Sequence, residues 1–219
     1  MVVIAEKTRG AKTPAISEQK ALAVFKQKAA AVSKEQREPQ EFAVAPKPFS
    51  ASDLDDMTDD GYRREVIEGR LIVTPSPIFE HQSAVSGLHY VLKHNCPPGY
   101  RVAIAPLDWR PPIGDSLQPD LMVIREEDYN PKGFMLGTPL LVVEVRSPST
   151  ATFDETEKRA RYESLGVPDY WMLDPAIPSL VALHLTDGQY VEIARVGGKE
   201  TFEAKTPYPA TVVPSELIR

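Results

Sequence analysis

The spacing of hydrophobic residues predicts a mixed α/β domain from about residue 49 onward. Strands are indicated where apolar and polar residues alternate, or where a short apolar run stands between turn residues. Helices are indicated where apolar residues recur every three or four positions behind a capping residue. In chain order, the expected elements are strands at 64–67 and 70–73, a helix over 76–95, strands at 102–109, 117–124 and 140–145, a helix over 152–166, a strand at 170–173, and a hairpin of strands 180–185 and 190–196.

Residues 1–48 differ in composition from the rest of the chain. They hold nine Lys and Arg residues and five Glu residues, whereas residues 49–219 hold 16 basic and 26 acidic residues. The segment 16–36 is rich in good helix formers but has only a weak apolar stripe, which predicts a marginal or partner-induced helix. We therefore expect an N-terminal extension over residues 1–48, either a solvated tail or a basic arm that touches nucleic acid, followed by a domain over residues 49–219.

Composition narrows the class of protein further. The chain has one cysteine, Cys96, so neither an intrachain disulfide nor a multi-cysteine zinc site is expected, and a reducing, cytoplasmic setting is favoured. No apolar run approaches the ~20 residues of a membrane span, so no membrane partner is expected. The net charge of −6 argues against non-specific nucleic-acid binding by charge alone. An acidic body can still meet a phosphate through a bound metal ion.

Glu144 is the most informative acidic residue. It stands inside the run 140–145, whose other residues are all apolar. Such a run indicates a strand that is covered on both faces. An unpaired carboxylate would be costly there, so a metal ion, a cationic partner or protonation must compensate.

Asp120 is the second candidate. The alternation of strand 117–124 places it on one face with Met122 and Ile124. Pro119 cannot donate to a β-ladder, so the strand effectively starts at Asp120. Carboxylates on adjacent strands repel when they lie close together, and Mg²⁺ or Mn²⁺ relieves that repulsion by taking their oxygens as ligands. The alternative interpretation is an Asp that caps a turn at the start of the strand.

Lys158 follows Glu144 on the next expected helix, with Asp154 and Tyr162 four residues away on either side. It is either the surface partner of Asp154 or a cation aimed at the carboxylates, where it orients a water or stabilises phosphorane charge. Glu65 and Glu68 lie in the early hairpin, where one of them adds a ligand or a hydrogen bond, or else they are exposed charges. His81 lies on the apolar face of its helix, where it is either a core histidine, the simpler interpretation, or a catalytic one.

These residues belong to a series of short motifs that occur in a fixed order. The motifs are Arg64-Glu65-Val66-Ile67-Glu68-Gly69-Arg70-Leu71, Thr74-Pro75-Ser76-Pro77 with His81-Gln82, Gln118-Pro119-Asp120-Leu121, Val143-Glu144-Val145-Arg146-Ser147-Pro148-Ser149-Thr150, then Asp154, Lys158 and Tyr162, and Gly166-Val167-Pro168-Asp169-Tyr170-Trp171 with Leu173-Asp174-Pro175. Over about residues 53–215 the chain resembles the Uma-two-type restriction endonuclease family of the PD-(D/E)XK nuclease superfamily.

The resemblance implies an α/β fold with a restriction-endonuclease-like core, in which helices flank a mixed central β-sheet and β-hairpins lie at the periphery. It implies that Asp120 and Glu144 bind Mg²⁺ or Mn²⁺, and that Glu65 is a recurrent acidic residue that completes the site. The Lys position of the (D/E)xK element holds Arg146, which can stabilise charge but cannot act as a general base. The resemblance then displaces the required Lys to Lys158.

The expected function is metal-dependent endonucleolytic hydrolysis of phosphodiester bonds in DNA, by a protein that acts alone or as a homodimer. One alternative is a non-catalytic nucleic-acid-binding or protein-interaction module that keeps the nuclease fold, which Arg146 and the acidic body favour. Another is a carboxylate-pair hydrolase that acts on sugars without a divalent ion.

Overall fold

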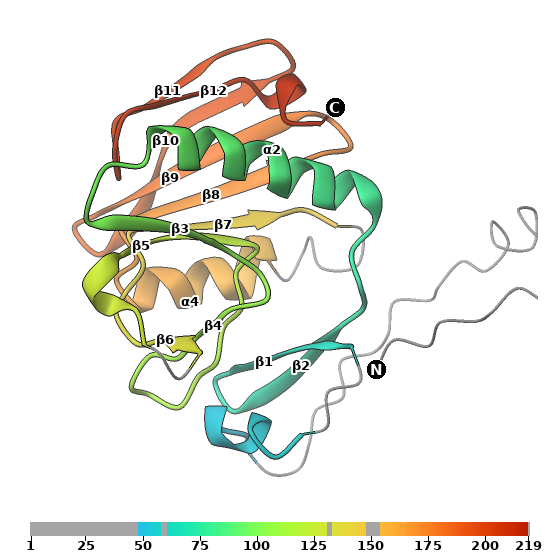
Figure 1. Cartoon of the computed structure of the whole chain (residues 1–219), viewed down its shortest axis with the longest axis vertical. Coiled ribbons are helices and arrows are strands. Elements are labelled where there is room, and N and C mark those ends of the chain that lie inside the picture. Colours follow the sequence, from blue (N-terminus) through green and yellow to red (C-terminus); the bar gives the residue numbers. More distant parts are fainter. Residues whose placement is uncertain (1–47, 58–60, 131–132, 148–153, 219) are drawn as a thin grey trace, which may run out of the picture. The chain divides into compact units, whose positions relative to one another are not determined.

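The structure, a computed structural model, describes residues 48–57, 61–130, 133–147 and 154–218 (Figure 1). The predictions for residues 1–47 and for the capping box that begins at Thr152 lie outside the described residues. No helix in the described part of the chain is long and apolar enough to cross a membrane.

A six-stranded mixed sheet forms the centre of the fold, in the order β10-β9-β8-β7-β5-β3. Its members are β3 (Tyr100–Ile104), β5 (Leu121–Arg125), β7 (Leu141–Val145), β8 (Asp169–Asp174), β9 (Ser179–Thr186) and β10 (Gln189–Gly197). The strands β7 and β8 run parallel and the other neighbours run antiparallel. The expected mixed sheet is thus confirmed, with β7 at its buried centre, as its apolar run predicts.

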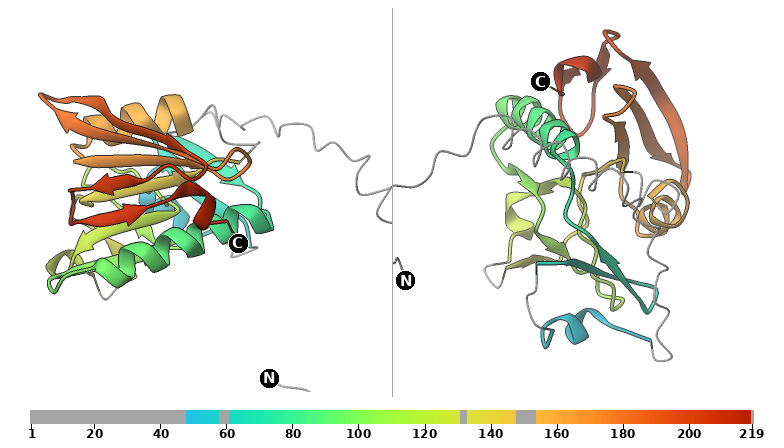
Figure 2. Two further views of the ribbon diagram at one scale, coloured as in Figure 1. Left: turned by 90° about the horizontal axis from the view of Figure 1, so that it is seen from above. Right: turned by 90° about the vertical axis from the view of Figure 1, so that its right-hand side faces the viewer.

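Different layers cover the two faces of this sheet (Figures 1 and 2). Helix α2 (Phe79–Asn95) packs on one face, together with the small hairpin of β11 (Phe202–Ala204) and β12 (Ala210–Val212). On the other face lie a π-helical turn, Asp154–Lys158, and the helix α4 (Arg159–Ser164) that continues it. Alternate side chains of β7 point to opposite faces of the sheet. Val143 packs beneath α2, whereas Val142 packs with Tyr162 of α4.

A peripheral hairpin packs as a further layer on the face of the sheet that carries α4. It consists of β1 (Arg63–Ile67) and β2 (Arg70–Thr74), joined by a turn in which both Glu68 and Gly69 have positive φ. An isolated bridge between Val66 and Ser116 holds β1 against the segment that leads into β5. The hairpin therefore lies beside the start of β5, where Asp120 stands.

Some element boundaries differ from those that the sequence predicts. The strand expected at 102–109 is broken at Pro106, which has no N–H to donate, into β3 and the short β4 (Asp108–Trp109). Helix α2 begins at Phe79 rather than at residue 76, and Ile78 caps it with no side-chain hydrogen bond. The short strands β6 (Phe134–Met135), β11 and β12 are absent from the prediction.

Candidate active site

Two buried carboxylates lie on the α4 side of the sheet. Register pairs Leu121 of β5 with Val143 of β7, so the next pair along these antiparallel strands is Asp120 and Glu144. Both acids therefore lie on one face and at one end of the two central strands. Each is only 3% exposed. The prediction that these strands bring the two acids together agrees with this register.

Asp120 is held by backbone and side-chain donors at once. Its Oδ2 accepts a hydrogen bond of 2.8 Å from the Val145 N–H and lies 3.1 Å from His81 Nε2, in the first turns of α2. His81 is itself buried, and among the described residues its Nδ1 has no hydrogen-bond partner. Asp120 thus joins β5, β7 and α2 at one point, which a turn-capping Asp would not do.

Lys158 lies between Glu144 and Glu65. Its Nζ is 3.0 Å from Glu144 Oε1 and 2.9 Å from Glu65 Oε2, and its side chain is 4% exposed. The π-helical turn ends at Lys158 and aims the residue inward, whereas the predicted surface alternative would leave it in solvent. Glu65 Oε1 accepts a further hydrogen bond of 2.8 Å from the Gln118 N–H.

Tyr162 completes the support of Glu144. It lies one turn after Lys158 on α4, is fully buried, and donates its hydroxyl to Glu144 Oε1 at 2.6 Å. Burial, together with the negative charge of Glu144, raises the pKa of the Tyr162 hydroxyl well above its ordinary value. Tyr162 is therefore a hydrogen-bond donor here at neutral pH and not a phenolate.

Arg63 is a residue of this cluster that sequence reasoning missed. Its guanidinium donates from Nη1 to Asp120 Oδ1 at 2.7 Å, and its Nη2 lies 3.4 Å from Glu65 Oε2 and 3.8 Å from Glu144 Oε2. The Nη2 also donates to the Gln118 carbonyl. A usable signal was present, because Arg63 and Glu65 are two residues apart on β1 and so share a face.

Opposing effects set the pKa values of the buried acids. Burial raises the pKa of Asp120, but the hydrogen bond from His81 and the charges of Arg63 and Lys158 outweigh it, so the pKa lies below its ordinary value. For Glu65 the balance has the same sign, since the charges of Arg63 and Lys158 and the bond from Gln118 outweigh burial. Both acids are thus ionised at neutral pH.

The two remaining candidates lie elsewhere. The Arg146 guanidinium, 46% exposed, lies 3.2 Å from Asp174 Oδ2 at the end of β8. Glu68 is exposed in the β1–β2 turn, and its Oε1 lies 3.2 Å from Arg161 Nη1. Of the five site residues that the sequence predicts, the structure therefore gathers Asp120, Glu144, Lys158 and Glu65, and places Arg146 against a different acid.

The residues of the cluster fit a divalent metal ion in donor type and charge. Three carboxylates converge on one guanidinium, so the structure already holds a cation among them, and hard oxygen donors are what Mg²⁺ and Mn²⁺ prefer. Among the described residues, no group of three or more His, Cys, Asp or Glu side chains is spaced to hold a metal ion. Asp120 and Glu144 would be the ligands, with Glu65 beside them.

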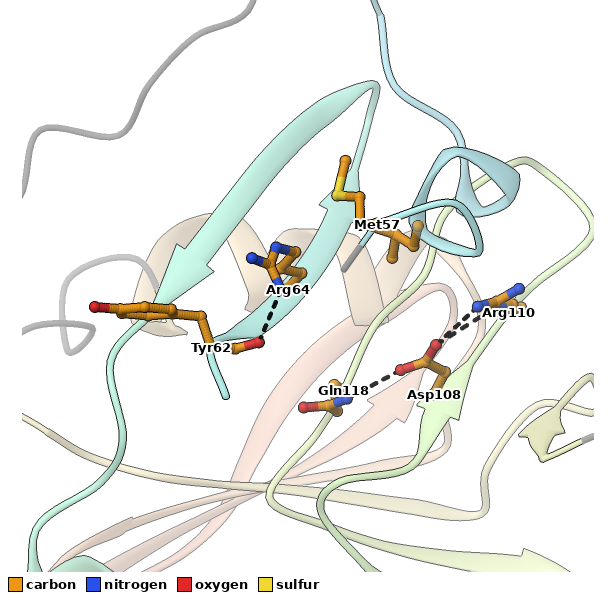
Figure 3. Close-up of a pocket in the computed structure, with 7 residues that line it drawn as sticks. Met57, Tyr62, Arg64, Asp108, Arg110 and Gln118 are labelled. Carbon is orange, nitrogen blue, oxygen red and sulfur yellow. Dashed lines mark hydrogen bonds and ion pairs between the residues drawn. The ribbon is translucent and has the colours of Figure 1, made fainter. Parts of the chain in front are cut away.

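A shallow pocket adjoins the cluster (Figure 3). Its lining includes Tyr62, Arg64 and Arg110, and it shares Gln118 with the acidic site. The Gln118 side chain donates to Asp108 Oδ1 at 3.0 Å, while its backbone contacts Glu65 and Arg63. The pocket therefore presents two arginines, a tyrosine and the carboxylate of Asp108, which pairs with Arg110, next to the buried acids.

The fold and the cluster together define a restriction-endonuclease-like α/β protein. The family model described as "Putative restriction endonuclease" matches residues 51–213, and the chain belongs to this Uma2 family. A crystal structure of a "putative nuclease belonging to DUF820" from Anabaena variabilis ATCC 29413 has the same fold, with a TM-score of 0.60 at 18% identity, over 78% of this chain and 98% of that one. The search of curated proteins found no match.

Proposed function

We propose that this protein is a metal-dependent endonuclease that hydrolyses phosphodiester bonds of DNA. The observation that carries the proposal is the position of Lys158, whose Nζ lies 3.0 Å from Glu144 Oε1 in a buried cluster that also holds Asp120 and Glu65. Membership of the Uma2 family supports nuclease activity in general. The metal and the DNA substrate are our additions, argued from the donor set and from the neighbouring pocket.

Each residue has a separate task in this proposal. Asp120 and Glu144 would hold the ion, which when bound would polarise the scissile phosphate and lower the pKa of a water. Lys158 orients the attacking water and stabilises negative charge as it develops on the phosphoryl oxygens. Tyr162 and the Val145 N–H keep the two acids in their rotamers, which limits the reorganisation required during the reaction.

The pocket favours nucleic acid over a sugar substrate. Arg64 supplies positive charge of the kind that phosphate binding requires, whereas Arg110 in the same pocket is paired with Asp55 and Asp108. The Tyr62 ring, 50% exposed, offers a face on which a base can stack. These residues border the cluster through Gln118, so a strand bound along them would pass close to Asp120 and Glu144.

The test is a cleavage panel. Full-length protein is incubated with plasmid DNA, single-stranded DNA and RNA, in Mg²⁺, in Mn²⁺ and in excess EDTA. We expect DNA cleavage with either ion and none in EDTA. The Glu144→Gln variant, which keeps the shape of the side chain, should lose cleavage, whereas Glu126→Gln, in an exposed pair with Arg101, should retain it. Equal cleavage in EDTA would falsify the metal-dependent mechanism, and cleavage of RNA alone would refute the choice of DNA.

The second candidate function is a non-catalytic nucleic-acid-binding module. The observation that favours it is that Arg63 and Lys158 already balance most of the charge of the three acids. It predicts DNA binding without cleavage under every metal condition of the panel. Binding that is unchanged in Glu144→Gln would then support this module over the enzyme.

A further inference from the structure

The three carboxylates of the cluster share one arrangement of their oxygens. In each, one oxygen is fixed by donors that belong to the scaffold. For Asp120 this oxygen is Oδ2, held by the Val145 N–H. For Glu144 it is Oε1, held by Tyr162 and Lys158. The corresponding oxygen of Glu65 is Oε1, held at 2.8 Å by the Gln118 N–H.

The second oxygen of every carboxylate lies within 3.8 Å of the same guanidinium, and that of Glu65 also lies 2.9 Å from Lys158 Nζ. Arg63 Nη1 lies 2.7 Å from Asp120 Oδ1, and Arg63 Nη2 lies 3.4 Å from Glu65 Oε2 and 3.8 Å from Glu144 Oε2. A divalent ion held by Asp120 and Glu144 would need these same outward oxygens, because the inward ones are engaged by the scaffold. The ion and the guanidinium therefore require the same place.

The two cations of the cluster differ in how they are held. The Lys158 side chain is 4% exposed and contacts two acids, whereas the Arg63 side chain is 23% exposed. Among the described residues, the Arg63 Nε has no hydrogen-bond partner, so the side chain is held through its Nη atoms. Arg63 is thus the more exposed of the two cations that contact the acids.

Charge balance points the same way. Leaving His81 aside, three carboxylates with Lys158 and a divalent ion form a neutral set, whereas the same set with Arg63 also in place carries excess positive charge. A buried excess charge is costly. Without the ion, Arg63 and Lys158 leave the three carboxylates with one net negative charge, so binding of a divalent ion gives a neutral set only if Arg63 leaves.

We propose that Arg63 is an internal counter-cation that occupies the metal position of this site, and that Mg²⁺ or Mn²⁺ binds by displacing its guanidinium. The inference rests on the proposed function, because it takes the acidic cluster to be the metal site. It assigns Arg63 the role of setting metal affinity. The apparent dissociation constant of the site is its intrinsic dissociation constant divided by the fraction of molecules in which Arg63 has left the acids.

Calorimetric titration of the full chain with Mn²⁺ tests this role without any cleavage assay. The Arg63→Gln variant removes the competing charge, and we expect it to bind Mn²⁺ about tenfold more tightly than the wild type, or better. Combining it with Asp120→Asn should abolish the gain, which locates the ion at the cluster. The control is Arg70→Gln, on the same hairpin but in an exposed pair with Glu157, and it should leave the dissociation constant unchanged.

Thermal unfolding gives a second readout. In EDTA, Arg63→Gln should unfold at a lower temperature than the wild type, because three buried acids lose a partner, and Mn²⁺ should raise its unfolding temperature by more than it raises that of the wild type. If Arg63→Gln does not fold, Arg63→Lys takes its place, since one ammonium cannot bridge three acids and should compete less well.

The outcomes separate this inference from the nuclease proposal. Equal or weaker Mn²⁺ binding by Arg63→Gln, beside a wild type that binds the ion, overturns the role of Arg63 and leaves the nuclease proposal standing. Absence of Mn²⁺ binding in both proteins overturns the inference together with the metal requirement. Cleavage that persists in EDTA would then show that the protein is a nuclease that needs neither a metal ion nor the displacement of Arg63.

Discussion

At the scale of single residues, two cations near Glu144 have different surroundings. Lys158 is buried and bonds to Glu144 and Glu65, whereas Arg146 stands two residues after Glu144 in the chain and lies against Asp174. A cation in a dry site stabilises developing charge more strongly than one in contact with water. Contact and burial therefore separate two residues that the sequence alone treats as related candidates.

The corresponding prediction compares Lys158→Gln with Arg146→Gln. We expect Lys158→Gln to lower the rate of DNA cleavage by about 100-fold or more, because it removes the buried charge next to the acids. We expect Arg146→Gln to lower it by less than about tenfold. Single-turnover cleavage with Mg²⁺ measures both rates, and circular dichroism confirms that each variant is folded. A larger loss in Arg146→Gln than in Lys158→Gln would reverse this assignment.

The acidic part of the site could be predicted because strand periodicity decides on which face a residue lies. Alternation assigns the face of Asp120, whereas Glu144 stands out as the one acid in an apolar run, and the two strands are neighbours in the sheet. The contacts of Arg63 could not be predicted, since they depend on how the β1–β2 hairpin docks beside the segment 116–118. Helical spacing likewise places Tyr162 beside Lys158 but does not show that its hydroxyl reaches Glu144.

At the scale of elements, the long elements could be predicted and the short ones could not. Helix α2 and the strands β7, β8, β9 and β10 each have a pattern that extends over five or more residues. The strands β4, β6, β11 and β12 have two or three residues, too few to show a period. They form because neighbouring segments offer backbone partners, which is a property of the tertiary fold.

Helix α2 also shows how packing can reverse a local preference. A Cβ added at Gly87 would lie 2.4 Å from the backbone oxygen of Leu217. Helix propensity alone makes Ala better than Gly by about 1 kcal/mol. The contact with Leu217 makes Ala worse than Gly in the free energy of unfolding. The atoms that the added Cβ would meet belong to the backbone, and they cannot move aside as the end of a flexible side chain can.

We predict that Gly87→Ala lowers the free energy of unfolding by about 1–3 kcal/mol through this overpacking. Chemical denaturation followed by circular dichroism measures the change. Ser86→Ala, an exposed neighbour on the same helix, should stay within about 0.5 kcal/mol of the wild type. A stabilised Gly87→Ala protein would mean that α2 and Leu217 are farther apart than the structure shows.

At the scale of the whole molecule, the ionised cluster links stability to pH. Asp120 and Glu65 have pKa values below their ordinary ones, of about 4, because Arg63 and Lys158 and local hydrogen bonds outweigh burial. A carboxyl group of this kind contributes stability that is fully present above its unfolded pKa. That contribution is lost as the pH falls from there toward the lower, folded-state value.

The free energy of unfolding in EDTA should therefore decrease as the pH is lowered from about 5 to 3. Glu65→Gln removes one of the responsible groups, so its stability should fall less steeply in this range, by up to about 1.4 kcal/mol per pH unit. Urea denaturation at fixed pH values gives the slope for each protein, independently of any offset that the substitution causes at pH 7. Glu126→Gln, whose exposed carboxylate pairs with Arg101, should keep the wild-type slope. Identical slopes for Glu65→Gln and wild type would show that Glu65 does not couple folding to proton binding. Acids outside the cluster would then be responsible for the loss of stability at low pH.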